Sequence, residues 1–341
     1  MHTCAHAYTH THMSIHTRQE AGSMEEYTGD IIVTGGGRNE LQAGRNLTAE
    51  AMQRFIAFID AKPKTVQTYT RALRQLFAYL AVNGQNAPLR DDIISFREDL
   101  KASGHKPTTV CNYINAARLF FQWTEQEGIY PNIAAHIKGA KLDRQHKKDY
   151  LTSRQVKGVM GEISTDTLKG LRDYAILALM VTGGLRTIEV ARADIGDLRT
   201  LGDNTVLYVQ GKGRDEKTDY VKIDPKVEAA IRRYLKCRAV TDPGAPLFAS
   251  VSNNNNGQRM TTRAISGTVK ARLVAAGYNS DKLTAHSLRH TAVTLSLLAG
   301  KDLTEVQEFA RHSNIATTMI YNHTLDKSKN GCAEAIAQAI L

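Results

Sequence analysis

The sequence predicts a mainly α-helical protein with two domains, and three observations support this prediction. The chain has 341 residues, which is more than one hydrophobic core usually organises. Apolar residues recur at helical spacing through most of the chain from residue 47 onward. The alternation that is typical of strands is confined to one short region, so we expect a small antiparallel hairpin within a mostly helical second domain.

The charge balance favours a polyanionic partner. Lys and Arg number 44 against 34 Asp and Glu, a formal net charge of +10, which favours nucleic acid. The longest apolar run, residues 174–181, is too short to span a bilayer, and the N-terminus lacks the apolar segment of a secretion signal. The four cysteines have neither metal-ligand nor paired spacing. We therefore expect a cytoplasmic DNA-binding protein with no metal, no other cofactor and no membrane segment.

Residues 1–46 differ from the rest of the chain. They are rich in His and Thr and include a glycine-rich turn or linker, TGGGRNE. The histidines could hold a metal, but no ordered scaffold is predicted to fix their geometry. We expect a disordered leader.

An internal repeat organises the first domain. Residues 62–77, KPKTVQTYTRALRQLF, and 106–121, KPTTVCNYINAARLFF, share the pattern K-P-x-T-V-x-x-Y-x-x-A-x-R-x-x-F without a gap. In each copy Pro and Thr suit the first turn of a helix, and apolar residues follow at helical spacing. Two further helices fit residues 48–59 and 91–103. Because two copies are too few for a solenoid, we expect a compact four-helix domain over residues 47–135.

The starts of the repeated helices carry basic and hydroxyl side chains where the helix dipole is positive, which suits a phosphate group. Simple helix capping is the alternative. A basic linker follows over residues 136–149; it could follow a DNA backbone or merely be solvated. The candidate DNA-binding residues are Lys62, Lys64, Thr65, Lys106, Thr108, Thr109, Lys141, Arg144 and Lys147.

The second domain begins near residue 150 and contains the predicted hairpin. Residues 204–210 and 219–223 alternate like two strands, and the turn GKGRDEKT between them carries Lys212 between two glycines. Alternatively, Lys212 is only a solvent-exposed lysine in a turn, without a role in a site. Upstream, the segment TGGLRTIEVARADIGDL predicts a helix that begins just after Arg186. Arginine there could bind a phosphate, with Glu189 orienting a neighbour, or it could only cap the helix or form a surface ion pair.

Two further polar segments lie near the C-terminus. In TAHSLRHT, His286 and Arg289 are three residues apart and share a helix face, whereas we expect the adjacent His290 to face elsewhere. In ARHSNIATTMIYNH, His312 precedes Tyr321. A half-buried helical tyrosine with a solvated hydroxyl is the commoner fate of such a residue.

Together, these groups are the ones that a metal-free cleavage of a phosphodiester would need. Breaking a phosphodiester needs stabilisation of negative charge on the non-bridging oxygens and protonation of the leaving oxygen. Without a metal, Arg, Lys and His must supply that charge. A tyrosine nucleophile keeps the phosphoryl group as an ester, so a strand could be rejoined to a different end without ATP.

The segments TGGLRTIEV, VQGKGRDEK, TAHSLRHT and ARHSNIATTMIYNH, in this order and spacing, resemble the tyrosine recombinases, which include the phage integrases, the Xer proteins and Cre. The resemblance covers residues 48–325. It implies a site-specific DNA recombinase or integrase of a mobile element or phage. Its SAM-like core-binding domain would span residues 47–135, and the family's catalytic fold residues 150–326. A tail helix over residues 327–341 would dock into the neighbouring protomer or pack back onto its own domain.

The resemblance also implies roles for individual residues. Arg186 and Arg289 would clamp the scissile phosphate, and Lys212 would protonate the departing 5′ oxygen. His286 would assist proton transfer, His312 would bond a non-bridging oxygen, and Glu189 would support the pocket from behind. Tyr321 would attack to give a 3′-phosphotyrosine. The implied partners are double-stranded DNA with two recombination sites, a homotetramer that joins them, and a directionality factor.

The sequence departs from the family pattern at Arg311, where most relatives carry Gly, and at Ala193, where Leu is usual. Arg311 could add a phosphate contact or disturb the turn. Two other functions remain open at this point: a DNA-binding relative that has lost catalysis, and a type IB topoisomerase. The complete set of six polar residues favours the recombinase over the first, and the helical first domain and the tail favour it over the second.

Overall fold

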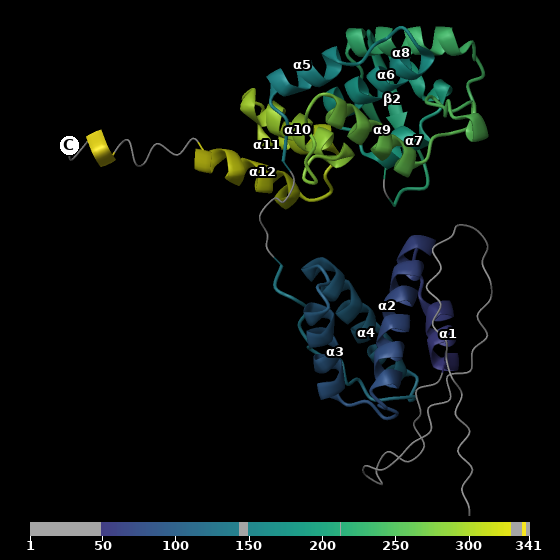
Figure 1. Cartoon of the computed structure of the whole chain (residues 1–341), viewed down its shortest axis with the longest axis vertical. Coiled ribbons are helices and arrows are strands. Elements are labelled where there is room, and N and C mark those ends of the chain that lie inside the picture. Colours follow the sequence, from purple (N-terminus) through teal and green to yellow (C-terminus); the bar gives the residue numbers. More distant parts are fainter. Residues whose placement is uncertain (1–48, 143–148, 212, 329–335, 339–341) are drawn as a thin grey trace, which may run out of the picture. The chain divides into compact units, whose positions relative to one another are not determined.

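The structure is a computed structural model that describes residues 49–142, 149–211, 213–328 and 336–338 (Figure 1). The chain divides into two compact units, Met1–Leu142 and Asp143–Leu341. No helix among the described residues is long and apolar enough to cross a membrane. The predicted leader, residues 1–46, lies outside the described residues.

The first unit consists of the four predicted helices. They are α1 (Ala49–Phe58), α2 (Pro63–Val82), α3 (Arg90–Ala102) and α4 (Pro107–Gln126). The two copies of the repeat form α2 and α4, and each begins at its proline, directly after an extended lysine. This follows from the fixed φ of proline and its missing N–H, which cost nothing in a first helical turn.

Aromatic side chains form much of the core of the first unit. Phe55 on α1 and Phe77 on α2 both pack edge-on against Phe120 on α4, with ring centroids 5.3 and 5.5 Å apart. Phe120 belongs to the repeated pattern's apolar face and is fully buried. The periodicity that predicted the helices therefore also selected the residues that join them.

The second unit is helical around one small sheet. Its elements are α5 (Ser153–Gly161), α6 (Leu168–Thr182), α7 (Thr187–Arg192), η2 (Ile195–Asp197), β1 (Leu198–Leu201), β2 (Asn204–Val209), β3 (Asp219–Lys222), α8 (Pro225–Arg238), η3 (Asn253–Asn255), α9 (Thr262–Ala275), α10 (Ala285–Leu298), α11 (Leu303–Ala310) and α12 (Ile315–Ser328). The apolar run of α6 lies at the centre of the core and is covered on several sides, by α8, α9 and α10. The mainly helical fold class is confirmed.

The sheet has one strand more than predicted. β2 and β3 form the expected antiparallel pair, with Leu207 opposite Val221, but β1 pairs with the other edge of β2, with Leu198 opposite Leu207. The predicted antiparallel hairpin is therefore confirmed, and β1 extends it to a sheet of three strands. β1 has four residues, of which three are exposed, so it shows no alternation that a sequence pattern could reveal.

The loop between α6 and α7 depends on Gly184. Its φ is +58°, and a Cβ added there would lie 3.0 Å from the Phe309 ring of α11. Glycine is needed both for the left-handed backbone and for this close approach. The loop therefore lies tightly against the C-terminal end of α11, which brings two distant parts of the sequence together.

Candidate active site

Arg186 and Glu189 lie at the start of α7. The backbone N–H of Arg186 donates to Glu189 Oε2 at 2.8 Å, and its guanidinium Nη1 donates to Oε1 at 2.9 Å. The Glu189 side chain is 1 % exposed, whereas that of Arg186 is 28 % exposed. One carboxylate therefore holds both the backbone and the guanidinium of Arg186.

A second arginine, directly after the end of α11, reaches the same carboxylate. Arg311 Nη2 donates to Glu189 Oε2 at 2.9 Å. Burial alone would raise the pKa of the Glu189 carboxyl, but the charges of Arg311 and Arg186 and the bond from the Arg186 backbone outweigh it, so the pKa is lowered. Glu189 is therefore an ionised carboxylate shared by two guanidinium groups.

Arg289 on α10 is buried and is held by backbone oxygens from two directions. Its Nη1 donates to the Gly184 carbonyl oxygen at 2.5 Å, and its Nη2 donates to that of Ala310. Burial and the nearby charges of Arg186 and Arg311 lower the pKa of Arg289 to about 9, so the group stays protonated at neutral pH. Two guanidinium groups that are 103 residues apart in sequence thus meet where α11 ends and α7 begins.

His312 follows α11, and its Nδ1 lies 2.9 Å from Thr318 Oγ1. Burial, followed by the charges of Arg289, Arg186, Arg311 and His286, lowers its pKa to about 4. The imidazole is therefore neutral at physiological pH. Which ring nitrogen carries the proton depends on whether the threonine hydroxyl donates or accepts.

Tyr321 on α12 is buried, with 6 % of its surface exposed, and its ring lies against two imidazoles. The ring centroids are 6.4 Å from His312, nearly parallel, and 5.1 Å from His290. Burial raises the pKa of the phenol to about 12, although the nearby charges of Arg289 and Arg186 act in the opposite direction. The alternative of a half-buried tyrosine with a solvated hydroxyl does not match this burial.

The expectation that His290 faces elsewhere was wrong. Its ring packs edge-on against His286, with centroids 4.4 Å apart, and it is buried beside Tyr321. His290 does point away from its sequence neighbour Arg289, but it shares a helix face with His286, which lies four residues earlier. That spacing, and the helical spacing of Thr318 from Tyr321, were the signals that could have identified these two additional residues.

A hollow of about 560 Å³ opens beside these groups, and Arg186, Gly211, Arg214, Arg311 and His312 are among the residues that line it. His286 is exposed on α10. Lys212, the predicted proton donor, lies outside the described residues, although its neighbour Gly211 lines the hollow. The residue types at the site, cationic and imidazole groups around a phenol, suit an anionic phosphate and its charge in a transition state.

The predicted DNA-binding residues of the first unit are at its surface. Lys62, Lys64, Thr65, Lys106 and Thr108 are exposed at the starts of α2 and α4, Thr109 is half-buried, and Lys141 is exposed. Arg144 and Lys147 lie outside the described residues.

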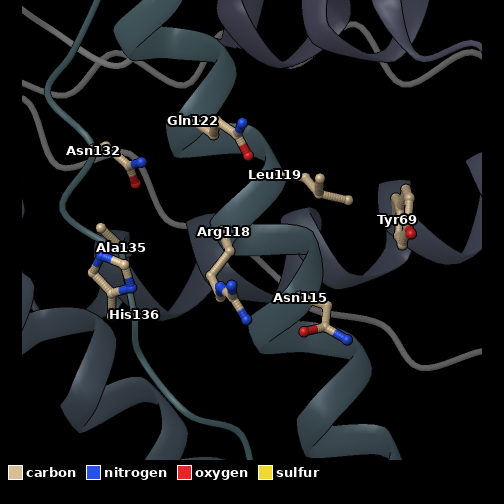
Figure 2. A pocket seen from close by; sticks show the side chains of 8 residues that line it. All are labelled: Tyr69, Asn115, Arg118, Leu119, Gln122, Asn132, Ala135 and His136. Carbon is tan, nitrogen blue, oxygen red and sulfur yellow. The ribbon is translucent and has the colours of Figure 1, made fainter.

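A second hollow, of about 400 Å³, lies in the first unit between α2, α4 and the segment that follows α4 (Figure 2). Arg118 extends between Asn115 and His136 in this view. None of the residues that line it is acidic; they are Tyr69, Asn115, Arg118, Leu119, Gln122, Asn132, Ala135 and His136. This surface was not predicted from the sequence, although polar residues at 115, 118 and 122 on one helix face could have indicated it.

Comparison with known proteins gives two family matches. The model of the "Phage integrase family" matches residues 149–328, and that of the "Phage integrase, N-terminal SAM-like domain" matches residues 58–128. The chain is 30 % identical to tyrosine recombinase XerD of Lacticaseibacillus casei, over 79 % of this chain and 92 % of that protein. It is 31 % identical to tyrosine recombinase XerC of Pseudomonas savastanoi pv. phaseolicola, over 77 % and 86 %.

Solved structures show the same fold. The XerH site-specific recombinase bound to a palindromic difH substrate matches with a TM-score of 0.68 at 21 % identity, over 85 % of this chain and 84 % of that one. The Tn1549 transposon integrase in complex with a circular intermediate DNA matches with a TM-score of 0.65 at 19 % identity, over 80 % and 93 %. The predicted arrangement of a SAM-like domain with a helical domain and small sheet is confirmed.

Proposed function

Because the chain belongs to the phage integrase family of tyrosine recombinases, we propose that it cuts and rejoins DNA strands at specific sites through a covalent bond between Tyr321 and a 3′ phosphate. The observation that carries this proposal is the position of Tyr321. The phenol is buried against His312, within the electrostatic influence of Arg186 and Arg289. The hollow beside it is lined by three arginines together with Asp219 and Glu308.

The reaction exchanges one phosphate ester for another. The Tyr321 oxygen forms a bond to phosphorus while the bond to the 5′ oxygen of the next nucleotide breaks. The phenolic proton leaves towards His286, and the departing 5′ oxygen takes a proton from Lys212. In the second half of the cycle a 5′ hydroxyl attacks the phosphotyrosine and releases the phenol, so neither ATP nor water is consumed.

Arg186 and Arg289 stabilise the negative charge that grows on the non-bridging oxygens. Each guanidinium has five N–H donors, and the backbone carbonyls and Glu189 use only some of them. The bonds to these protein groups hold both guanidinium groups in place before the DNA arrives, so little reorganisation is needed in the transition state.

His312 acts as a neutral hydrogen-bond donor. In this proposal the Thr318 hydroxyl donates to Nδ1, which fixes the proton on Nε2 and directs that N–H to a phosphate oxygen. The lowered pKa supports this role, because a neutral imidazole can hold the tautomer that the threonine selects.

The high pKa of Tyr321 keeps the phenol protonated until the phosphate is in place. Burial opposes the phenolate, and the arginine charges favour it. The reaction therefore depends on proton removal during the attack rather than on a preformed phenolate.

Double-stranded DNA is the substrate, and the first unit supplies part of the surface that binds it. The exposed starts of α2 and α4 would contact phosphates, and the acid-free hollow around Arg118 would face the duplex (Figure 2). Four protomers would join two sites, with the tail beyond residue 327 linking neighbours and with a directionality factor as a further partner. Integration of a mobile element or phage is the reaction that we favour.

A nicked duplex that traps the covalent intermediate tests the proposal. The wild-type protein should form a DNA adduct that survives denaturation, and Tyr321→Phe should form none while it still binds the duplex. Absence of a wild-type adduct would identify a relative that binds DNA without cutting it. Adducts of equal yield on unrelated sequences would instead indicate a topoisomerase.

A further inference from the structure

Arg311 occupies a backbone position that usually requires glycine. Its φ is +53° and its ψ +47°, directly after α11. The N–H of Arg311 donates to the Glu308 carbonyl at 2.8 Å, and that of His312 donates to the Gln307 carbonyl at 3.0 Å. These two bonds form a Schellman motif, in which the left-handed residue is most often glycine because a Cβ there is strained. Because the backbone N–H of His312 takes part in this motif, the motif also fixes the position of the His312 backbone.

The Arg311 side chain folds back into the site instead of extending into solvent. It is 9 % exposed. Its Nη1 donates to the Phe309 carbonyl at 2.8 Å, and its Nη2 donates to the Gly184 carbonyl at 3.2 Å and to Glu189 at 2.9 Å. The guanidinium therefore connects the end of α11 with the loop before α7 and with the carboxylate that holds Arg186.

Arg311 also contacts Arg186 through its own backbone. Arg186 Nη2 lies 3.3 Å from the Arg311 carbonyl oxygen, which accepts a hydrogen bond from it. Arg186 is thus held by Glu189 on one side and by Arg311 on the other, and Glu189 is itself held by Arg311. Each group in this triangle fixes the orientation of the next.

Two features of Arg311 are unfavourable for folding. The first is the left-handed backbone. The second is the Nε atom, which is buried and has no hydrogen-bond partner. Unfavourable local features of this kind cluster at functional sites, where the surrounding structure maintains them.

We propose that Arg311 is a positioning residue for strand cleavage: by sharing the Glu189 carboxylate and receiving a bond from Arg186, it holds the Arg186 guanidinium toward the phosphate-binding hollow. This inference rests on the proposed recombinase function. Glu189 carries one negative charge. If Arg186 were the only partner of Glu189, the charges of the two groups would cancel. Because Glu189 pairs with Arg311 as well, it can orient Arg186 while the three groups together keep a net positive charge that attracts the phosphate.

The test uses the full chain with the nicked duplex at saturating DNA, in single-turnover experiments. Arg311→Gly removes the guanidinium and also relieves the backbone strain. Ala239→Gly is the matched control, because Ala239 has the same left-handed conformation, φ +55°, at the end of α8 without a charged side chain. Arg311→Lys keeps the charge but cannot form the same set of bonds.

We expect Arg311→Gly to lower the cleavage rate roughly 10- to 100-fold with less than about a 3-fold change in DNA affinity, as for loss of an interaction made mainly in the transition state. Ala239→Gly should cleave at the wild-type rate. Arg311→Lys should lie between the wild type and the glycine variant. Methylguanidinium should restore part of the Arg311→Gly rate, because Arg311 lines the open hollow.

In a Glu189→Gln background, Arg311→Gly should have little further effect, because Arg311 acts through that carboxylate. Wild-type cleavage by Arg311→Gly would overturn the inference, and so would a loss that appears only as weaker DNA binding or that adds fully to Glu189→Gln. A wild-type protein without any adduct would overturn the proposed function instead, so the two failures are distinguishable.

Discussion

The Glu189 carboxylate binds Arg186 twice, through its backbone N–H and through its guanidinium, and is itself almost completely buried. Breaking a buried ion pair leaves an uncompensated charge, which is costlier than losing a surface pair. Glu189→Gln should therefore lower the free energy of unfolding by about 3 kcal/mol, measured by chemical denaturation.

The control is Glu228→Gln on α8, whose partner Arg232 is 63 % exposed. This surface pair should contribute less than about 1 kcal/mol. Equal losses of unfolding free energy in the two variants would show that the buried Glu189 ion pairs stabilise the fold no more than a surface pair does.

Arg186→Ala should slow cleavage more than His312→Ala. A guanidinium that stabilises developing negative charge contributes about 10²–10³-fold, whereas one neutral hydrogen bond contributes about 10-fold. Single-turnover cleavage of the nicked duplex measures both rates. Equal losses would contradict the roles assigned to these residues.

Acid should destabilise the protein through His312. Its pKa is lowered from 6.5 to about 4, so the unfolded chain binds a proton between these values that the folded protein does not. The stability from this group is complete above pH 6.5 and is lost as the pH falls towards 4. Burial is the largest cause of the lowered pKa, followed by the charges of Arg289, Arg186, Arg311 and His286.

Melting temperatures of the wild type and of His312→Gln across this pH range test the prediction. The wild type should lose stability more steeply than the variant. Parallel curves would mean that His312 titrates normally in the folded protein, as would an NMR titration with a midpoint near 6.5.

Arg118→Ala should weaken binding to duplex DNA and reduce the salt dependence of binding by about one phosphate contact. The physical reason is the loss of the only side chain among the lining residues of the second hollow that is always charged. Fluorescence anisotropy at several salt concentrations measures the slope.

The control for Arg118 is Lys101→Ala, which removes an exposed charge that is paired with Glu98 near the end of α3. It should leave the slope nearly unchanged. An unchanged slope in Arg118→Ala would place this hollow away from the DNA.

Deletion of residues 330–341 should leave binding to a single site near normal but lower assembly on paired sites. In a helix over this segment, Ala333, Ile336, Ala337 and Ile340 would share one apolar face, which suits docking into a neighbouring protomer. Sizing of complexes with one and two sites measures the difference. Normal pairing by the truncated protein would remove the tail from the assembly.

The helices of the first unit could be predicted because their signals are local. Proline at a helix start and apolar residues at helical spacing act over one or two turns, and both copies of the repeat carry them. Arg186, Arg289, His312 and Tyr321 could be selected as candidates because their motifs are short and ordered, and their catalytic roles remain a proposal. β1 could not, since its four residues become a strand only by pairing with β2.

The sequence by itself therefore determined the two-part helical organisation, the residue types of the site and their order along the chain. Only the tertiary structure decided which of them meet: His290 beside Tyr321, Thr318 beside His312, and Arg311 on the carboxylate of Glu189. The physical reason is that these contacts join elements far apart in sequence or depend on how helices pack. Packing of α10, α11 and α12, and the left-handed turn at Arg311, set them.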